Sequence, residues 1–209
     1  MKTAMYYGKT YFVSSSLTFD FSVALEYAVW QELSENVSGL SSLYRSEPFY
    51  GKFKQFICGL YSRQVKKLGW EAHPDESART GTMRGTAISM MAISGDNEVM
   101  KEAYDRFMKY KEQPEANPLG GDLRPVIFKL ALRFDEAVVL PALKEIYERS
   151  TFPEEQRDCL GVMGKVEDPL RHSEVFEYTI FSGKVRRRSF HRGLLYDLLN
   201  LTIGCVVAS

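Results

Sequence analysis

The stretch GWEAHPDESARTGTMRGTAISMMAISGDNEVMKEAYDRF, residues 69–107, decides the fold of this chain. Gly69 stops one helical run, a Pro-containing turn opens the next, and a polar break at 94–97 separates that run from a third. Apolar side chains recur every three or four positions, at Met83, Ala87, Met90 and Met91 and then at Val99, Ala103 and Phe107. This spacing predicts two consecutive amphipathic helices, the first capped near Asp75 and the second at Asp96.

Helical spacing continues outward in both directions. Before the stretch it predicts helices over roughly 22–44 and 49–68, and after a polar loop at 113–121 it predicts four more. These four begin at Asp122, Asp135, Phe152–Pro153 and Asp168–Pro169, and the last ends near Gly183. Because helical rather than alternating spacing runs through most of the chain, we expect an all-α fold.

An internal repeat indicates how these helices pack. The apolar trio Val99, Ala103 and Phe107 maps onto Val139, Leu143 and Tyr147 at an offset of 40 residues. That period is typical of HEAT- and armadillo-like helix pairs. A third unit, 170–181, is shorter and places Glu174 where an apolar residue is expected. The prediction is a HEAT/armadillo-like helical-pair superhelix, an α-solenoid, in which neighbouring pairs cover each other's apolar faces.

The composition is that of a globular protein without a global charge bias. The 209 residues are 44% hydrophobic, and 27 basic residues balance 27 acidic ones. This balance supplies no overall field to attract nucleic acid or an acidic membrane. Cys58, Cys159 and Cys205 lack metal-ligand spacing, which favours packed thiols in a reducing compartment. The apolar stretch 194–208 is interrupted by polar residues and shorter than a membrane span, so we expect a core helix there.

No reactive constellation is recognisable in the chain. His73, His172 and His191 are its only histidines, and no two have the i, i+4 spacing of a zinc-binding helix. The Gly120–Gly121 turn lacks the Lys-Ser/Thr of a phosphate-binding loop, and we expect it to end in the N-cap Asp122. No serine has a base placed beside it by sequence. We therefore expect no catalytic, metal-binding or cofactor-binding residues here.

One basic cluster invites a functional interpretation. Its candidate peptide- or partner-binding residues are Arg186, Arg187 and Arg188, with Lys184 and Arg192 beside them. A solvated or interdomain surface is the first interpretation, because acids such as those in 174–177 offset the charge. A nucleic-acid patch, or a site for a peptide carboxylate or an acidic partner, remains open.

The order of short motifs along the chain resembles a known family. Leu68-Gly69-Trp70-Glu71, Glu76-Ser77 and Met83-Arg84-Gly85 are similar to the "LGW…ES…LR" run of the M1 zinc aminopeptidases, in their ER-aminopeptidase-like C-terminal helical domain, puromycin-sensitive type. Further matches are Val29-Trp30 with Leu40 and Leu43, Gly95 with Ala103 and Arg106-Phe107, Asp122-Leu123-Arg124-Pro125-Val126, Glu155 with Arg157, Leu160, Gly161 and Asp168-Pro169, and Ser182 with Val185-Arg186. The resemblance covers about 21–189, with 1–20 as an unmatched N-terminal segment and 190–209 as an unmatched C-terminal helix or tail. At Arg188 and Ser189 the chain departs from the family's Gln and Asp.

The resemblance implies an all-helical superhelix that packs on a thermolysin-like catalytic domain and encloses a peptide chamber. In that family, zinc is bound by H-E-x-x-H and the substrate amine by G-x-M-E-N, both in earlier domains. Neither motif occurs here, so the chain is expected to be inactive alone and to hold no cofactor. Expected partners are a peptide substrate, an M1 catalytic domain or both, without nucleic acid or a membrane span, in the cytoplasm.

Two functions remain in competition. The first is a non-catalytic C-terminal domain or fragment of an M1-type aminopeptidase, incomplete relative to the family domain. A fragment, a truncated gene model or a stand-alone paralogue would each account for this incompleteness. The alternative is a stand-alone α-solenoid scaffold that binds a protein partner.

Overall fold

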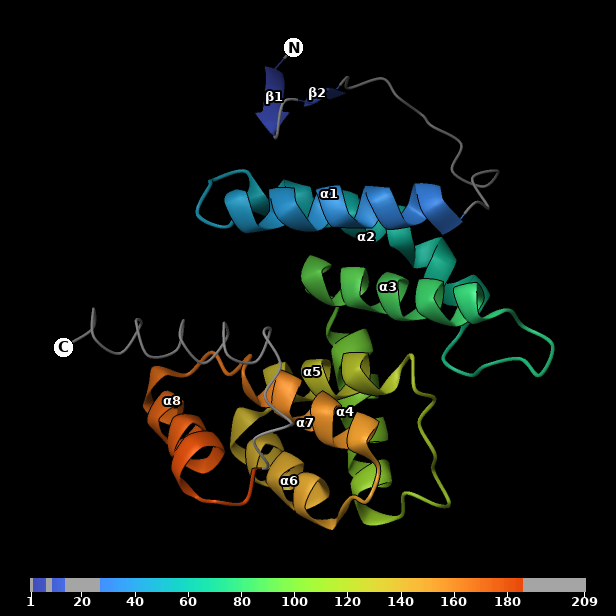
Figure 1. The fold of residues 1–209 in the computed structure, drawn as a ribbon. Helices are drawn as coiled ribbons and strands as arrows, with labels where there is room; N and C mark the ends of the chain where they lie inside the picture. The colour runs from blue at the N-terminus through green and yellow to red at the C-terminus, as the bar shows by residue number, and fades with distance from the viewer. Residues whose placement is uncertain (1, 7–8, 14–26, 186–209) are drawn as a thin grey trace.

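A computed structural model describes residues 2–6, 9–13 and 27–185 (Figure 1). The helices in these residues are α1 (Tyr27–Leu43), α2 (Tyr50–Leu68), α3 (Ala78–Ser94), α4 (Asn97–Glu112), α5 (Arg124–Phe134), α6 (Glu136–Arg149), α7 (Pro153–Met163), α8 (Pro169–Phe176) and the π-helix η1 (Glu177–Phe181). The predicted all-α body is therefore confirmed. Sequence analysis missed one feature, an antiparallel hairpin of β1 (Lys2–Tyr6) and β2 (Lys9–Val13), which lies at the edge of the helical body.

The helices are arranged in successive layers between the two ends of the molecule (Figure 1). Helices α1 and α2 form one end, α3 lies beneath them, and α4 to α8 form the other end. The most extensive helix contacts are those of α2 with α3 and of α4 with α5, and α6 packs against α7. Helix α5 also contacts α3, α6 and α7, which makes it the centre of the array.

The two matching apolar trios occupy equivalent places in this array. Val99, Ala103 and Phe107 on α4 and Val139, Leu143 and Tyr147 on α6 are all buried. Each of these helices packs against the helix that follows it, α5 or α7. The paired-helix part of the prediction thus has a structural counterpart, whereas a regular superhelix remains a prediction.

The third unit shows why its sequence deviates from the repeat. Glu174 on α8 is exposed, and its carboxylate accepts from Lys144 Nζ at 2.6 Å and lies 3.9 Å from Arg171 Nη1. At the position expected to be apolar, Glu174 therefore links α8 to α6 through its ion pair with Lys144. Beyond α8 the chain continues as η1, and Gly183, with φ of 70°, follows it.

The helix N-termini confirm some predicted caps and correct others. The carboxylates of Asp96, Asp135 and Asp168 cap α4, α6 and α8, as predicted for each. The prediction for Asp75 is wrong: Ser77 caps α3, and its Oγ accepts from the backbone N–H of Thr80 at 3.3 Å.

The prediction for Asp122 is also wrong. Helix α5 begins at Arg124, its cap residue is the buried Leu123, and no side chain caps it. Pro125 stands in the first turn, where a missing N–H costs nothing, so one fewer donor needs a cap. The Asp122 side chain instead lies beside α3.

Candidate functional site: a groove between α1, α3 and α5

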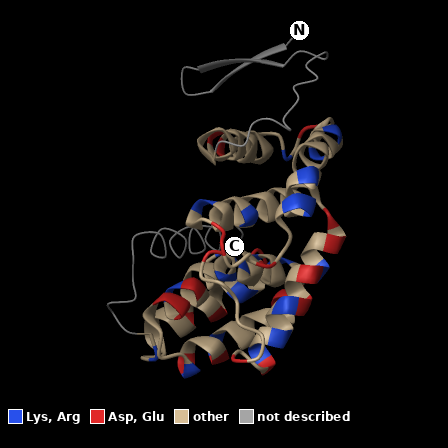
Figure 2. Ribbon diagram, turned by 90° about the vertical axis from the view of Figure 1, so that its right-hand side faces the viewer, with Lys and Arg blue, Asp and Glu red and all other residues tan. Residues whose placement is uncertain are grey.

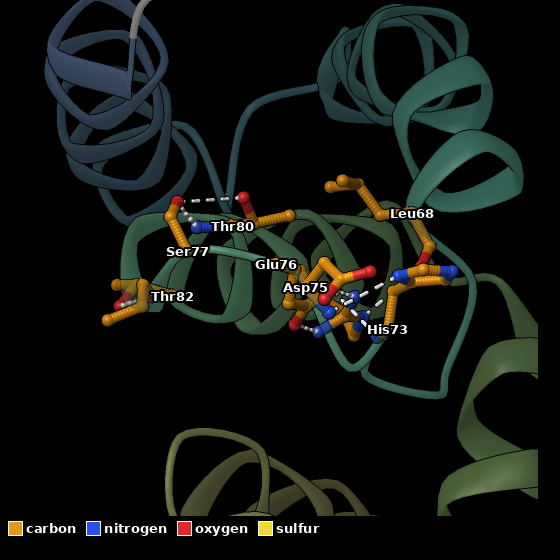
Figure 3. Close-up of polar contacts among 9 residues, drawn as sticks. Leu68, His73, Asp75, Glu76, Ser77, Thr80 and Thr82 are labelled. Atoms are coloured by element: carbon orange, nitrogen blue, oxygen red, sulfur yellow. Dashed lines mark hydrogen bonds and ion pairs between the residues drawn. The ribbon is translucent and has the colours of Figure 1, made fainter.

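One arginine of α3, Arg84, fixes the connection from α2 to α3. Figure 3 shows its two partners in that connection, Leu68 and Glu76. Arg84 donates from Nη1 to Glu76 Oε1 at 2.6 Å and from Nη2 to Glu76 Oε2 at 2.5 Å. Its Nε donates to the backbone carbonyl of Leu68, the last residue of α2, at 3.2 Å. The backbone N–H of His73 donates to the same glutamate at 3.1 Å. One guanidinium thus joins both ends of the loop to α3.

The electrostatics of this contact favour the ion pair. The Arg84 side chain is only 5% exposed and that of Glu76 14%. The hydrogen bond from Arg84 is the main cause that lowers the pKa of Glu76 to about 2, and the same bond raises the pKa of Arg84. A buried arginine without this carboxylate would be an uncompensated charge.

A second arginine, on α4, holds the beginning of the same loop. Arg106 donates from Nη1 to Glu71 at 2.6 Å and from Nε to Glu102, one turn earlier in its own helix, at 2.7 Å. Its guanidinium carbon lies 5.1 Å from the centre of the Trp70 ring. Some of the motif residues that carry the family resemblance, Trp70-Glu71, Glu76 and Arg84 among them, therefore hold the loop that precedes α3.

Helix α3 approaches the start of α5 closely because two of its residues are glycines. A Cβ built on Gly81 would lie 2.7 Å from Asp122 Oδ2. A Cβ on Gly85 would lie 3.3 Å from Val126 Cγ2 and 3.4 Å from the Asp122 carbonyl oxygen. The spacing of four residues places both glycines on one face of α3. This close approach sets one wall of a groove.

An open groove of about 520 Å³ lies between α1, α3 and α5. Its lining is dominated by small hydroxyls: Ser34 and Ser38 from α1, and Thr82, Thr86 and Ser89 from α3. The charged lining groups are Glu35, Asp122 and Lys129, and the apolar ones are Met90, Ile93 and Val126. Such a lining offers donors, acceptors and both signs of charge.

Lys129 is the one cation among the residues that line this groove. Solvent reaches its side chain, yet the surrounding protein walls desolvate the ammonium, and this is the main cause that lowers its pKa. The neighbouring charges of Arg133 and Lys165 lower it further, against the opposing effect of Glu167. The α5 wall of the groove is therefore locally positive.

The residues singled out from the sequence do not form a reactive site. His73 lies in the α2–α3 loop, and the His172 ring lies 3.3 Å from the Val166 carbonyl oxygen. Cys159 is fully buried and burial raises the pKa of its thiol, while Cys58 is half-buried against the core. Both thiols pack as predicted.

The basic cluster is only partly within the described residues. Arg186, Arg187 and Arg188 lie outside them, as do Arg192, His191 and Cys205. Lys184 is described, and its Nζ donates to Glu148 at 2.7 Å and lies 5.9 Å from the centre of the Tyr178 ring.

A zinc ion has no matching ligand set in the described part of the chain. Within residues 2–6, 9–13 and 27–185, no three His, Cys, Asp or Glu side chains are grouped so that they could hold a metal. The same residues contain no helix with the length and apolar character to cross a membrane.

Sequence reasoning missed the groove residues, although their pattern was visible. Thr82, Thr86 and Ser89 follow the i, i+4, i+7 spacing of one helix face. The sequence analysis used only the apolar positions of the same helix and assigned no role to these hydroxyl residues.

The fold and the groove define an all-helical, paired-helix domain organised around α5. The chain belongs to the ERAP1-like C-terminal domain family, which it matches over residues 13–196.

Curated relatives with similar sequences are aminopeptidases. The chain is 26% identical to Aminopeptidase M1 of Arabidopsis thaliana over 68% of its own length and 16% of that protein. It is 23% identical to the Puromycin-sensitive aminopeptidase of Caenorhabditis elegans (77% and 17%) and to the Alanine/arginine aminopeptidase of Saccharomyces cerevisiae (79% and 19%). The chain therefore spans less than a fifth of the length of each of these proteins. The resemblance to M1 aminopeptidases is confirmed.

Proposed function

We propose that this chain is a non-catalytic wall of an M1-type aminopeptidase, packing on a catalytic domain and enclosing the chamber that receives the peptide. Membership of the ERAP1-like C-terminal domain family carries the proposal. The 209-residue sequence is consistent with it, because no two of the three histidines are spaced as in H-E-x-x-H. Zinc, and the bond cleavage that depends on it, would belong to another part of the assembly.

The groove between α1, α3 and α5 is the part of the wall that we assign to the peptide. The Thr82 and Thr86 hydroxyls donate to carbonyls of their own helix, so toward a peptide they act as acceptors for N–H groups. Ser38 and Ser89 can also donate to peptide carbonyls, whatever the peptide sequence. Lys129 adds attraction for acidic groups, and Glu35 and Asp122 for basic ones. A lining of this kind suits loose retention of varied peptides better than recognition of one sequence.

The rigid α2–α3 connection supports this assignment. Arg84 and Arg106 fix the loop at both ends, so α3 would present its hydroxyl stripe at a constant position relative to α1 and α5. The proposal also includes two further features: the helices form a HEAT-like superhelix, and the protein is located in the cytoplasm.

A peptide titration tests the assignment. Amide spectra of the isotopically labelled chain would be recorded with increasing amounts of a mixed peptide of about ten residues. We expect shifts at Thr82, Thr86 and Ser89, and weaker shifts in Lys129→Gln. Shifts confined to surfaces away from the groove would contradict the assignment.

A further inference from the structure

Helix α2 has a surface that the wall function does not use. Its exposed side is a single ridge, which we call the α2 ridge: Lys52, Phe56, Gly59, Arg63, Lys66 and Lys67. These positions lie within one helical stripe, opposite the buried Ile57 and Tyr61. From Lys52 to Lys67 the ridge is about 22 Å long at 1.5 Å per residue.

The charge of the α2 ridge is unbalanced. The helix carries no Asp or Glu, and none of the four ridge cations is in an ion pair with a described residue. Helices α3 and α5 also lack Asp and Glu, but their Arg84, Arg124 and Arg133 each pair with a carboxylate of another segment. In the α4–α8 half as a whole, basic and acidic residues lie among one another (Figure 2). Helix α4 contains both Lys and Glu in its first two turns.

Helix stability does not account for all of these cations. Lys66 and Lys67 are in the last turn, where positive charge suits the helix dipole. Lys52 is in the first turn, where the same dipole disfavours it, and Arg63 is in neither turn. A binding role explains all four positions together.

Exposed apolar side chains gather at the N-terminal end of the ridge. Phe56 is 53% exposed, and so is Leu43, while Phe49 is 44% exposed. Ring contacts join the two phenylalanines into a cluster through Tyr44 and Phe53: Tyr44 with Phe49 at 5.0 Å, Tyr44 with Phe53 at 5.7 Å and Phe53 with Phe56 at 6.2 Å. Large apolar side chains grouped on a surface mark a contact site.

We propose that the α2 ridge, with this aromatic cluster, docks on an anionic membrane surface. Cations along one exposed helical stripe can lie against lipid headgroups, while Phe49 and Phe56 enter the interfacial layer. Three of the four ridge cations are Lys, which protein interfaces use sparingly. The ridge therefore fits a lipid surface better than a protein.

The test is co-sedimentation of the full chain with lipid vesicles. The wild type should bind phosphatidylcholine vesicles that contain about 30 mol% phosphatidylserine, and should not bind pure phosphatidylcholine. Raising the salt from about 0.1 M to about 0.5 M should release it. A double variant, Lys52→Gln with Lys66→Gln, should bind about 30-fold more weakly.

A matched control removes the same charge elsewhere. Lys101 and Lys109 are exposed on α4, and Lys101→Gln with Lys109→Gln should change vesicle binding by less than about twofold. Phe56→Ser, which keeps the charge, should weaken vesicle binding already at about 0.1 M salt. Thermal melts followed by circular dichroism would verify that each variant is folded.

Three results would overturn the proposal. One is wild-type binding that does not depend on phosphatidylserine, and another is an equal loss in the ridge and α4 double variants. The third is absence of vesicle binding together with self-association that Phe56→Ser abolishes, which would make the ridge a protein interface.

Discussion

Arg84 and Glu76 form a two-point ion pair, at 2.6 and 2.5 Å, that ties the α2–α3 loop to α3. Removing the guanidinium takes three hydrogen bonds away, one from the Leu68 carbonyl oxygen and two from the Glu76 carboxylate, which keeps the backbone N–H of His73. Arg84→Ala should therefore lower the free energy of unfolding by about 3 kcal/mol. Chemical denaturation measures this, and Arg79→Ala, an exposed position on the same helix, should change it by less than about 0.5 kcal/mol. Equal losses of unfolding free energy in Arg84→Ala and Arg79→Ala would contradict a stabilising role for the ion pair of Arg84 with Glu76.

The same ion pair predicts a pH dependence of stability. The pKa of Glu76 falls from its ordinary value of 4.5 to about 2 in the folded state. A lowered carboxylate pKa stabilises the fold above pH 4.5, and this contribution is lost as the pH falls from 4.5 through about 2. Denaturation midpoints over this range should fall less in Glu76→Gln than in the wild type. Denaturation midpoints that fall equally with pH in Glu76→Gln and in the wild type would contradict the assignment of this pH dependence to Glu76.

Substitution of two helical glycines by alanine should change the free energy of unfolding in opposite directions. Gly59 on α2 has open space around it, so Gly59→Ala should raise the unfolding free energy by about 0.5–1 kcal/mol through helix propensity. Gly85 faces Val126 and the Asp122 backbone, so Gly85→Ala should be less stable than the wild type. Thermal melts compare the two, and a similar gain in both would mean that α3 and α5 are not in close contact.

A buried carboxylate makes Tyr110 a further sensitive position. The hydroxyls of Tyr110 and Ser150 both donate to Glu155, which is 7% exposed. Tyr110→Phe removes one donor from a buried acceptor and should destabilise the fold by about 2 kcal/mol. Tyr104→Phe on the same helix keeps the ring contact with Phe134 and should be nearly neutral by the same denaturation assay. A neutral Tyr110→Phe would refute the importance of this bond.

Local patterns predicted most of the helices correctly. Helical spacing located α2 to α8 within a few residues, and Gly69 and Gly95 end α2 and α3 with positive φ, as their missing side chains permit. The repeat trios on α4 and α6 were correctly predicted to be buried because burial follows the helical period.

Features that depend on tertiary contacts were not predictable in this way. Ser77 and not Asp75 caps α3, and the neighbouring Glu76 pairs with Arg84, eight residues along the chain. Asp122 is not a cap, because the glycines of α3 bring that helix close to it. The groove depends on α1, α3 and α5 together, and no window of sequence contains all three.

The most direct test of the wall function is an aminopeptidase assay on the purified chain. Alanyl- and arginyl-anilides would be incubated with the chain, with and without a chelator, and bound zinc would be measured on the same sample. The account predicts no hydrolysis above buffer and no stoichiometric zinc. Hydrolysis that a chelator abolishes and zinc restores would contradict it.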